Sequence, residues 1–306
     1  MKRGAWIVLT LGLAGGCSDY DPKGWLVDRT RVIGARTEAS ADPTRASLEP
    51  GERASVTWLV VNPASTPRLA WAFAACAPPG GNYAASRCDG AVLASGSGTS
   101  DGELATMAFD TPSLAATGDA KELLLLAAFC EGGAPALDAR AFAATCAGGG
   151  AALLAATRVR LAAAGPNRNP AIGADTIRLG DQPLPEARFS ISSGACTGTP
   201  DAPVVQAGAK VKLHYRFDDR EREVAPDAPG GREGLLLSHL VTSGELERQY
   251  SSLDPGEPAS KDVSVELSAP GAEAVGADGR LIRLFFVLRD DRGATGFAVR
   301  SVCVRP

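Results

Sequence analysis

Histidine is nearly absent from this chain: only two histidines, His214 and His239, occur among its 306 residues. Histidine is the commonest side chain in zinc and other transition-metal sites, so this count excludes a centre built from several histidines. Aromatic residues make up 6% of the chain, which leaves little material for a surface that stacks sugar rings. We therefore expect no metal site and no cofactor.

An excess of basic charge is also missing. The chain has 31 Lys and Arg against 35 Asp and Glu, a net charge of −4 and a pI of about 5.4. A nucleic-acid-binding domain shows a high pI and a clustered basic face, so nucleic acid is not an expected partner. Hydrophobic residues at 45% and charged residues at 22% are normal for a globular protein and exclude a wholly disordered chain.

No hydrophobic run is long enough to span a bilayer, which takes about 20 apolar residues. The longest candidate, Ala5 to Ala14, follows the basic pair Lys2-Arg3, and this pattern predicts that residues 1–16 are a signal peptide. The stretch ends in Leu13-Ala14-Gly15-Gly16-Cys17. An ordinary signal peptide followed by an unrelated cysteine is the alternative.

Small residues before a cysteine resemble the lipobox of bacterial lipoproteins, although Ala14 stands where that family usually has Leu. The resemblance implies that Cys17 is lipidated and becomes the mature N-terminus, with the membrane as a partner. Residues 17–28 would then form a tether, with Trp25 packing on the first folded unit. Ser18 rather than Asp after the cysteine favours the outer membrane of the cell envelope, by analogy with lipoprotein sorting.

Six cysteines remain beyond Cys17, and an even number in an exported chain predicts disulfides. Their spacings do not fit zinc sites, whose ligand pairs lie two to four residues apart. The first four cysteines allow three connectivities. We favour neighbouring pairs that each bracket a loop rich in Gly or Pro, together with one long bridge across the second half. These pairs are Cys76–Cys88, Cys130–Cys146 and Cys196–Cys303.

Short runs with period-two alternation, bounded by Gly, Pro and Asp, predict an all-β protein of the sandwich type. The Ala-rich stretch 151–164 could equally form a helix. The loops Pro78–Arg87 and Ser95–Gly102 are polar and Gly-rich, so we expect them to be mobile surface segments. Predicted strands cover 30–38, 54–60, 69–76, 104–109, 123–130, 157–161, 211–217, 235–242, 263–267, 282–288 and 297–304.

The opening of the first half recurs in the second. Aligning Gly208 with Gly51 places Val211, Leu213, Tyr215 and Phe217 on Ala54, Val56, Trp58 and Val60. Four matched inward positions after a matched glycine predict two copies of one architecture. The segment 165–170 contains two prolines and two asparagines and predicts the boundary, which gives domains at 29–165 and 166–306.

The Pro50-Gly51 turn before an alternating strand, and Asp290-Asp291-Arg292-Gly293 before the last strand, resemble bacterial immunoglobulin-like domains. The whole chain resembles a group of bacterial lipoproteins from high-GC genomes that carry an Asn-x-Asn-Pro linker, here at 167–170. The resemblance implies two tandem immunoglobulin-like antiparallel β-sandwich domains after a lipoprotein signal peptide. It implies no activity, and no catalytic residue is carried over from it.

Patterns that carry chemistry are scarce. The chain has no Gly-x-Ser-x-Gly elbow, and its Gly-rich stretch 96–102 lacks the Lys of a phosphate loop. The alternation points His214 outward and leaves His239 half-buried in an apolar strand, each in a structural role. The carboxylate pairs Asp218-Asp219, Asp290-Asp291 and Asp254 with Glu257 adjoin arginines or turns, which predicts ion pairs and turn hydrogen bonds.

We therefore expect a non-enzymatic, lipid-anchored envelope protein that is structural, adhesive or accessory to an envelope complex and that makes contacts through its loops. Tyr83, in the loop between Cys76 and Cys88, is the best candidate for a ligand contact. The alternative is a carbohydrate-binding module or an accessory domain of a polysaccharide-processing system. That alternative requires a groove with exposed aromatic and acidic side chains near Tyr83 or Asp218, and a new kind of enzyme is a third hypothesis.

Overall fold

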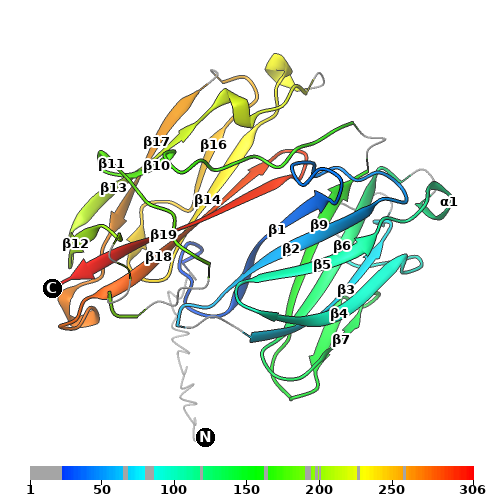
Figure 1. The fold of residues 1–306 in the computed structure, drawn as a ribbon, viewed down its shortest axis with the longest axis horizontal. Helices are drawn as coiled ribbons and strands as arrows, with labels where there is room; N and C mark the ends of the chain where they lie inside the picture. Colours follow the sequence, from blue (N-terminus) through cyan, green and yellow to red (C-terminus); the bar gives the residue numbers. More distant parts are fainter. Residues whose placement is uncertain are drawn as a thin grey trace, which may run out of the picture.

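The computed structural model describes residues 23–64, 68–79, 86–117, 120–161, 165–189, 194–196, 199, 201–225, 228–257 and 260–306. These residues form several β-sheets with one short α-helix, α1 (Leu114–Thr117), so the predicted all-β class is confirmed (Figure 1). In the same ranges, single-turn 3₁₀ helices cover Asp219–Glu221, Pro229–Gly231 and Ala272–Ala274. Within the described residues, no helix has the length and apolar character needed to cross a membrane.

The first half contains two antiparallel sheets that enclose one hydrophobic core. The three-stranded sheet has the order β1-β2-β5, with β1 at Arg31–Ala39, β2 at Arg53–Val61 and β5 at Leu104–Asp110. The four-stranded sheet has the order β4-β3-β6-β9, at Ala94–Asp101, Arg68–Cys76, Glu122–Cys130 and Leu153–Arg160. A separate hairpin consists of β7 (Pro135–Asp138) and β8 (Ala143–Cys146).

Alternating side chains of both sheets fill the space between them. Trp58 of β2 is 2% exposed and meets Phe129 of β6 edge to face, with ring centroids 6.1 Å apart. Phe73 of β3 contacts Phe109 of β5, with ring centroids 5.7 Å apart. Such aromatic pairs are worth about 0.5–1.5 kcal/mol beyond the area they bury, so they help to fix how the two sheets pack.

The second half also consists of two sheets around one core. One has the order β11-β10-β13-β17-β15, at Gln182–Pro183, Ile177–Leu179, Lys210–Phe217, Lys261–Ser268 and Glu245–Leu246. The other has the order β12-β19-β18-β14-β16, at Val204–Gln206, Thr295–Arg305, Arg280–Asp290, Leu235–Val241 and Tyr250–Leu253. All pairings in this half are antiparallel except β12 with β19.

The two halves share one strand order. The sequence β1-β2-β5 corresponds to β10-β13-β17, and β4-β3-β6-β9 corresponds to β16-β14-β18-β19. Gly51 and Gly208, which precede the matched strands β2 and β13, have φ of 80° and 73°, a left-handed conformation that glycine adopts at little cost. Of the matched inward positions on β13, Leu213, Tyr215 and Phe217 are buried, and Val211 is partly buried against the same core.

The structure decides between strand and helix for one segment and overturns the predicted loop at another. The Ala-rich stretch forms the strand β9 rather than a helix over Leu153–Arg160, because it pairs with β6 along its whole length. The prediction of a mobile loop at Ser95–Gly102 is wrong, since Ala94–Asp101 is β4 and pairs residue by residue with β3.

The N-terminal segment packs on the second half, which corrects the expected place of Trp25. Leu26 bridges Val241 of β14 in parallel, and the amide of Val241 donates a hydrogen bond to the carbonyl of Trp25. Trp25 contacts the core of the second half, and Val27 is fully buried. Residues 25–27, which we expected in a tether, are therefore built into the fold.

A third hydrophobic cluster lies between the halves. Strands β1 and β2 contribute Ile33, Leu59 and Val61, while β14, β18 and β19 contribute Leu240, Phe285, Val287 and Val299. Gly34, which follows a register shift in β1, allows close approach, because a Cβ there would lie 2.5 Å from Cε1 of Phe297. The outer face of one sheet of the second half thus packs directly on the first half (Figure 1).

The expected boundary segment is itself fixed to both halves. The side-chain amide of Asn169 donates to the carbonyl of Thr37 on β1, and its Oδ1 accepts from the amide of Thr295 on β19. Asn167 is 1% exposed, and its backbone carbonyl accepts from the amides of Ala46 and Ser47. Because one asparagine side chain bridges two strands, the linker acts as a clamp rather than as a hinge.

Candidate functional site

The two residues that the sequence singled out for attachment and recognition, Cys17 and Tyr83, lie outside the described residues. The structure therefore does not place either side chain. The neighbourhood of the Tyr83 loop is nevertheless defined, because Cys76 and Cys88 bracket that loop and are both buried.

All three predicted disulfides are present, which confirms the pairing that we favoured among the possible connectivities. Cys76–Cys88, Cys130–Cys146 and Cys196–Cys303 have Cα–Cα distances of 5.8, 5.8 and 5.5 Å. These distances lie in the ordinary range for disulfides. The first two bridges belong to the first half, and the third joins the segment before β12 to β19.

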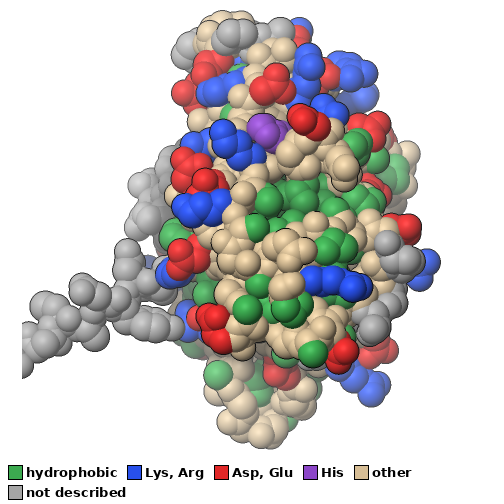
Figure 2. Space-filling view, turned by 90° about the vertical axis from the view of Figure 1, so that its left-hand side faces the viewer, with side chains coloured by type: hydrophobic (Ala, Val, Ile, Leu, Met, Phe, Trp, Pro, Cys, Tyr) green, Lys and Arg blue, Asp and Glu red, His purple; other side chains and the backbone are tan. Residues whose placement is uncertain are grey.

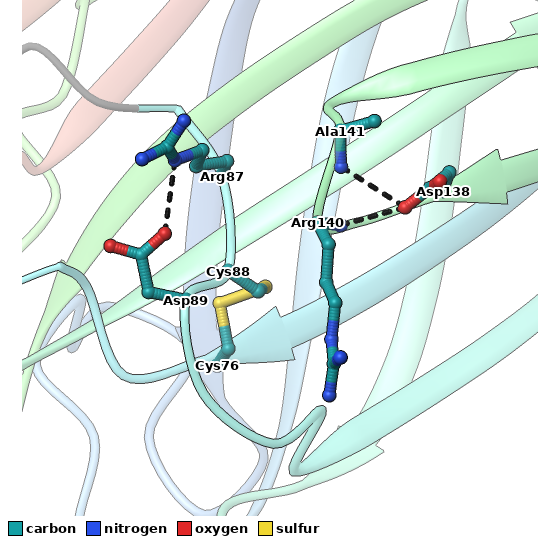
Figure 3. The surroundings of a disulfide bond; sticks show 7 residues. All are labelled: Cys76, Arg87, Cys88, Asp89, Asp138, Arg140 and Ala141. Carbon is teal, nitrogen blue, oxygen red and sulfur yellow. Dashed lines mark hydrogen bonds and ion pairs between the residues drawn. A yellow bond between two sulfur atoms is a disulfide. The ribbon is translucent and has the colours of Figure 1, made fainter.

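Two of these bridges hold the β7–β8 hairpin against the outer face of the four-stranded sheet. Cys130 ends β6 and Cys146 ends β8, so this bridge fixes one end of the hairpin. The amide of Cys88 donates to the carbonyl of Ala139 at 2.9 Å, which ties the first disulfide to the turn between β7 and β8. Figure 3 shows this turn beside the Cys76–Cys88 bridge. A small cluster that includes both cysteines, Leu124 and Leu126 fills the space beneath.

Beyond the hairpin, the uncovered part of the sheet forms a groove of about 780 Å³, called here the β4 groove. Its floor consists of small residues of β3 and β4. Its wall is the hairpin segment 137–140. The lining residues are Ala72, Phe73, Ala74, Val92, Ser95, Gly96, Ser97, Leu137, Asp138, Ala139 and Arg140.

The charged side chains on and near this wall differ in whether they form hydrogen bonds or ion pairs. The carboxylate of Asp138 accepts from the amides of Arg140 and Ala141, which closes the turn. Arg87 is paired with Asp89 on the neighbouring loop. Within the described part of the chain, no carboxylate lies within ion-pairing distance of the exposed guanidinium of Arg140.

The predicted carboxylate pairs are engaged in ion pairs and turns, as expected. Asp218 caps a 3₁₀ helix and pairs with Arg220, whose hydrogen bonds lower the pKa of Asp218 to about 2. Glu257 pairs with Lys261, and Asp291 accepts from the amide of Gly234.

Asp290 closes the β18–β19 hairpin by accepting from the amides of Arg292 and Ala294. It is 7% exposed, and burial, reinforced by the nearby charge of Glu233, raises its pKa to about 7. These contacts give the carboxylate a structural role in the turn.

A second cavity, of about 390 Å³, lies beside Asp218 and the linker. Glu221 lines it, accepts a hydrogen bond from the hydroxyl of the buried Tyr215, and has its pKa raised to about 7 by burial. No aromatic side chain is among the described residues that line this cavity, in contrast to the requirement of the carbohydrate-binding alternative. Trp58 is buried and Trp71 packs against the core, so both aromatics serve the interior.

His239 makes a contact that the sequence did not suggest. Its Nε2 lies 3.0 Å from Oγ of Ser251, because β14 and β16 are paired at this point. Burial, with a smaller contribution from Arg248, lowers the pKa of His239 to about 4, so the imidazole is neutral at pH 7. Nδ1 has no acceptor or donor among the described residues, and Phe286 packs edge-on against the ring. Without an acid that orients the ring, we assign this pair to core packing.

His214 lies half-buried on the outer side of β13, opposite Arg178 and Ser264.

Figure 2 shows a face of the molecule on which hydrophobic side chains gather centrally, with charged side chains around them. No group of three or more His, Cys, Asp or Glu side chains that could hold a metal ion occurs among the described residues. The β4 groove adjoins the turn that the Cys76–Cys88 bridge fixes, and another hollow, of about 750 Å³, is lined by segments of both halves, among them Leu26, Pro63 and Gly276.

Comparison with known proteins adds little. No family model and no curated protein matches the chain. Three of the solved structures that align with most of it share about one-tenth sequence identity with it. A bacterial ice-binding adhesin of 1.5 MDa, from a study of host cell surface retention, has a TM-score of 0.22 at 10% identity, with 90% of this chain and 66% of that chain covered.

The native conformation of E. coli alpha-2-macroglobulin has a TM-score of 0.23 at 9% identity, with 92% of this chain and 17% of that chain covered. Dimeric latent PorU from Porphyromonas gingivalis has a TM-score of 0.21 at 10% identity, with 91% of this chain and 24% of that chain covered. This chain therefore spans two thirds or less of each of them. TM-scores this low do not identify a shared fold, and they carry no argument about function.

Proposed function

We propose that this protein is a non-enzymatic, lipid-anchored protein of the cell envelope that is structural, adhesive or accessory to an envelope complex. It would bind its partner through surface segments of its first half. The observation that carries the proposal is the pairing of the six cysteines after Cys17 with one another. Disulfides persist in oxidising compartments, which agrees with export. Cys17 is then left as the cysteine directly after the signal sequence, where a lipid would be attached.

We also propose that the two halves are tandem immunoglobulin-like sandwiches, at 29–165 and 166–306. Support comes from the seven-strand order that both halves share, in sheets of three and four strands with antiparallel neighbours. The buried cluster between the halves and the Asn169 clamp support a rigid pair. A rigid pair suits a structural, adhesive or accessory role, because its loops are presented in one fixed arrangement.

The lipid anchor would hold the molecule close to the membrane. Five residues lie between Cys17 and Lys23, the first described residue, and the six Cα–Cα steps from Cys17 to Lys23 reach about 20 Å at most in an extended chain. The chain then enters the fold on β14 at Trp25–Val27. On this proposal the second half carries the attachment and the first half presents the β4 groove.

Fractionation of the native host tests the anchor. Wild-type protein should remain in washed outer membranes, whereas Cys17→Ala should appear in the soluble fraction. Ser18→Ala is the matched control and should stay with the membrane, while Ser18→Asp should move to the inner membrane. Retention of Cys17→Ala after washing would contradict the lipid anchor.

The carbohydrate-binding alternative is tested separately with the soluble Cys17→Ala protein on a glycan array. The proposal predicts no binding above that of a heat-denatured sample. Binding that depends on Tyr83, measured with Tyr83→Ala, would replace the protein partner with a glycan.

A further inference from the structure

The outer strand β4 has an open edge. It pairs with β3 from Arg68 with Asp101 to Ala75 with Ala94 without a register shift. Among the described residues, no other strand forms a ladder with it, so it ends its sheet. In an antiparallel edge strand, every second residue directs both its N–H and its C=O away from the partner strand. A short turn joins the end of β4 to β5, and the two strands contact each other. We infer that they lie closest beside this turn. The part of the β4 edge that is open to another strand is therefore residues 94–98.

Within the described ranges, this edge lacks the features that usually block strand addition. Lys, Pro, a β-bulge or very short length protects most natural edge strands. β4 has eight residues, Ala-Ser-Gly-Ser-Gly-Thr-Ser-Asp, and its single charge, Asp101, is paired with Arg68 of β3. The edge strands of the second half are much shorter, with two to four residues each.

Two glycines bring aromatic rings to the edge itself. A Cβ on Gly96 would lie 2.8 Å from Cε1 of Phe73, and one on Gly98 would lie 2.5 Å from Cζ2 of Trp71. The rings of β3 therefore cover the places where side chains of β4 would stand. Phe73 is buried in the core, so on this face a strand added beside β4 would have the partly exposed Trp71 within reach.

The opposite face of β4 borders the β4 groove. Ser95 and Ser97 are exposed and small, and with Ala72 and Ala74 they leave space for side chains of an added strand. Val92, 45% exposed, offers an apolar contact. The guanidinium of Arg140 on the groove wall, which has no carboxylate within ion-pairing distance among the described residues, favours an acidic side chain.

We propose that β4 receives an extended peptide segment of a partner protein as an additional strand. Main-chain hydrogen bonds to residues 94–98 supply the affinity, and alternate side chains enter the β4 groove. One acidic side chain of the peptide pairs with Arg140. This inference deepens the proposed function by naming the chemistry of the partner. It does not depend on the lipid, so the anchor can fail without affecting it.

The probe is a displayed library of random 12-residue peptides, selected on the full chain with Cys17→Ala. We expect selected peptides to be extended and to carry an acidic residue. Hydrogen exchange should show that they slow amide exchange within residues 94–98. A library that yields no binder, or binders that protect amides elsewhere, would overturn the proposal.

Variants locate the contact. Ser97→Lys places a charge on the open strand and should weaken binding at least tenfold. Thr106→Lys makes a similar change at an exposed position of β5, on the other sheet, and should leave affinity unchanged. Equal affinities of the two variants would contradict the assignment. Should Ser97→Lys fail to fold, Arg140→Gln replaces it, with an expected loss of severalfold for acidic peptides and none for their amide counterparts.

Discussion

Glu103 and Arg283 form a doubly hydrogen-bonded ion pair across the junction of the two halves, with side chains that are 0% and 1% exposed. Glu103 lies in the turn between β4 and β5, and Arg283 lies on β18, 180 residues later. The guanidinium also stacks on the Phe285 ring at 4.7 Å. Burial raises the pKa of the Glu103 carboxyl, and its hydrogen bonds with Arg283 oppose this shift. The pair joins the halves at a point from which water is excluded.

Glu103→Gln should destabilise the protein strongly. The amide keeps the shape of the carboxylate but leaves the charge of Arg283 buried without a counter-charge, and breaking a buried pair in this way costs about 3–5 kcal/mol. Urea unfolding measures the loss. Asp101→Asn, which breaks the exposed pair with Arg68, is the control and should cost less than about 1 kcal/mol. Similar losses for both variants would show that the junction pair is not buried in solution.

The stability of the β18–β19 turn should fall as the pH rises. The pKa of Asp290 is raised in the folded state from 3.8 to about 7, so the folded protein holds a proton that the unfolded chain has released. Between pH 4 and 7 the folded state therefore binds more protons, and its stability decreases with pH. For this shift, the loss from pH 5 to pH 8 is about 2–3 kcal/mol.

Asp290→Asn should remove this dependence, because the amide oxygen can still accept from Arg292 and Ala294 but does not titrate. Relative to wild type, the variant should gain stability between pH 5 and pH 8 in urea titrations at both values. Asp291→Asn, at the exposed neighbour, should run parallel to wild type. A variant at Asp290 that also runs parallel would refute the protonated turn.

Gly34→Ala should loosen the contact between the halves. Its Cβ would lie 2.5 Å from Cε1 of Phe297 and 3.2 Å from Cγ1 of Val287, so the ring must move. Overpacking of this kind costs about 1–3 kcal/mol. Gly90→Ala meets nothing within 4 Å and serves as the control, with no expected change. Thermal unfolding of the two variants distinguishes them, and equal melting temperatures would mean that β1 does not approach Phe297 as described.

The three disulfides should contribute unequally to stability. In the loop-closure model, the Cys196–Cys303 bridge, with a separation of 107, is worth about 4.8 kcal/mol. The Cys76–Cys88 bridge, with a separation of 12, is worth about 2.8 kcal/mol. Paired Cys→Ser replacements compared by urea unfolding should show this order. The reverse order would indicate that strain or residual structure, rather than loop closure, sets their contributions.

Alternation of apolar residues predicted the long strands that line the cores, but it missed the short strands β10, β15 and β16, which add Ile177, Leu246 and Leu253 to the core of the second half. Trp58 and Tyr215 were both expected to point inward, and both are buried. β4 was missed because its Gly, Ser and Thr residues carry no hydrophobic period. It is a strand because β3 pairs with it and because the rings of Phe73 and Trp71 cover its glycines. That information lies some 25 residues away in the chain.

The contacts that shape the site and the junction were beyond sequence reasoning for the same reason. The His239–Ser251 contact follows from the pairing of β14 with β16, and the Glu103–Arg283 pair follows from the packing of two halves. Cysteine parity, in contrast, is independent of register. Parity predicted that the six cysteines form disulfides, and the Gly- or Pro-rich loops between neighbouring cysteines led us to favour the pairs that the structure shows.

The lipid at Cys17 is tested most directly by mass spectrometry of the N-terminal peptide of the protein purified from host membranes. We expect a peptide that begins at Cys17 and carries the mass of a diacylglyceryl group, with no peptide from residues 1–16. A peptide that begins elsewhere, or one with an unmodified Cys17, would contradict it.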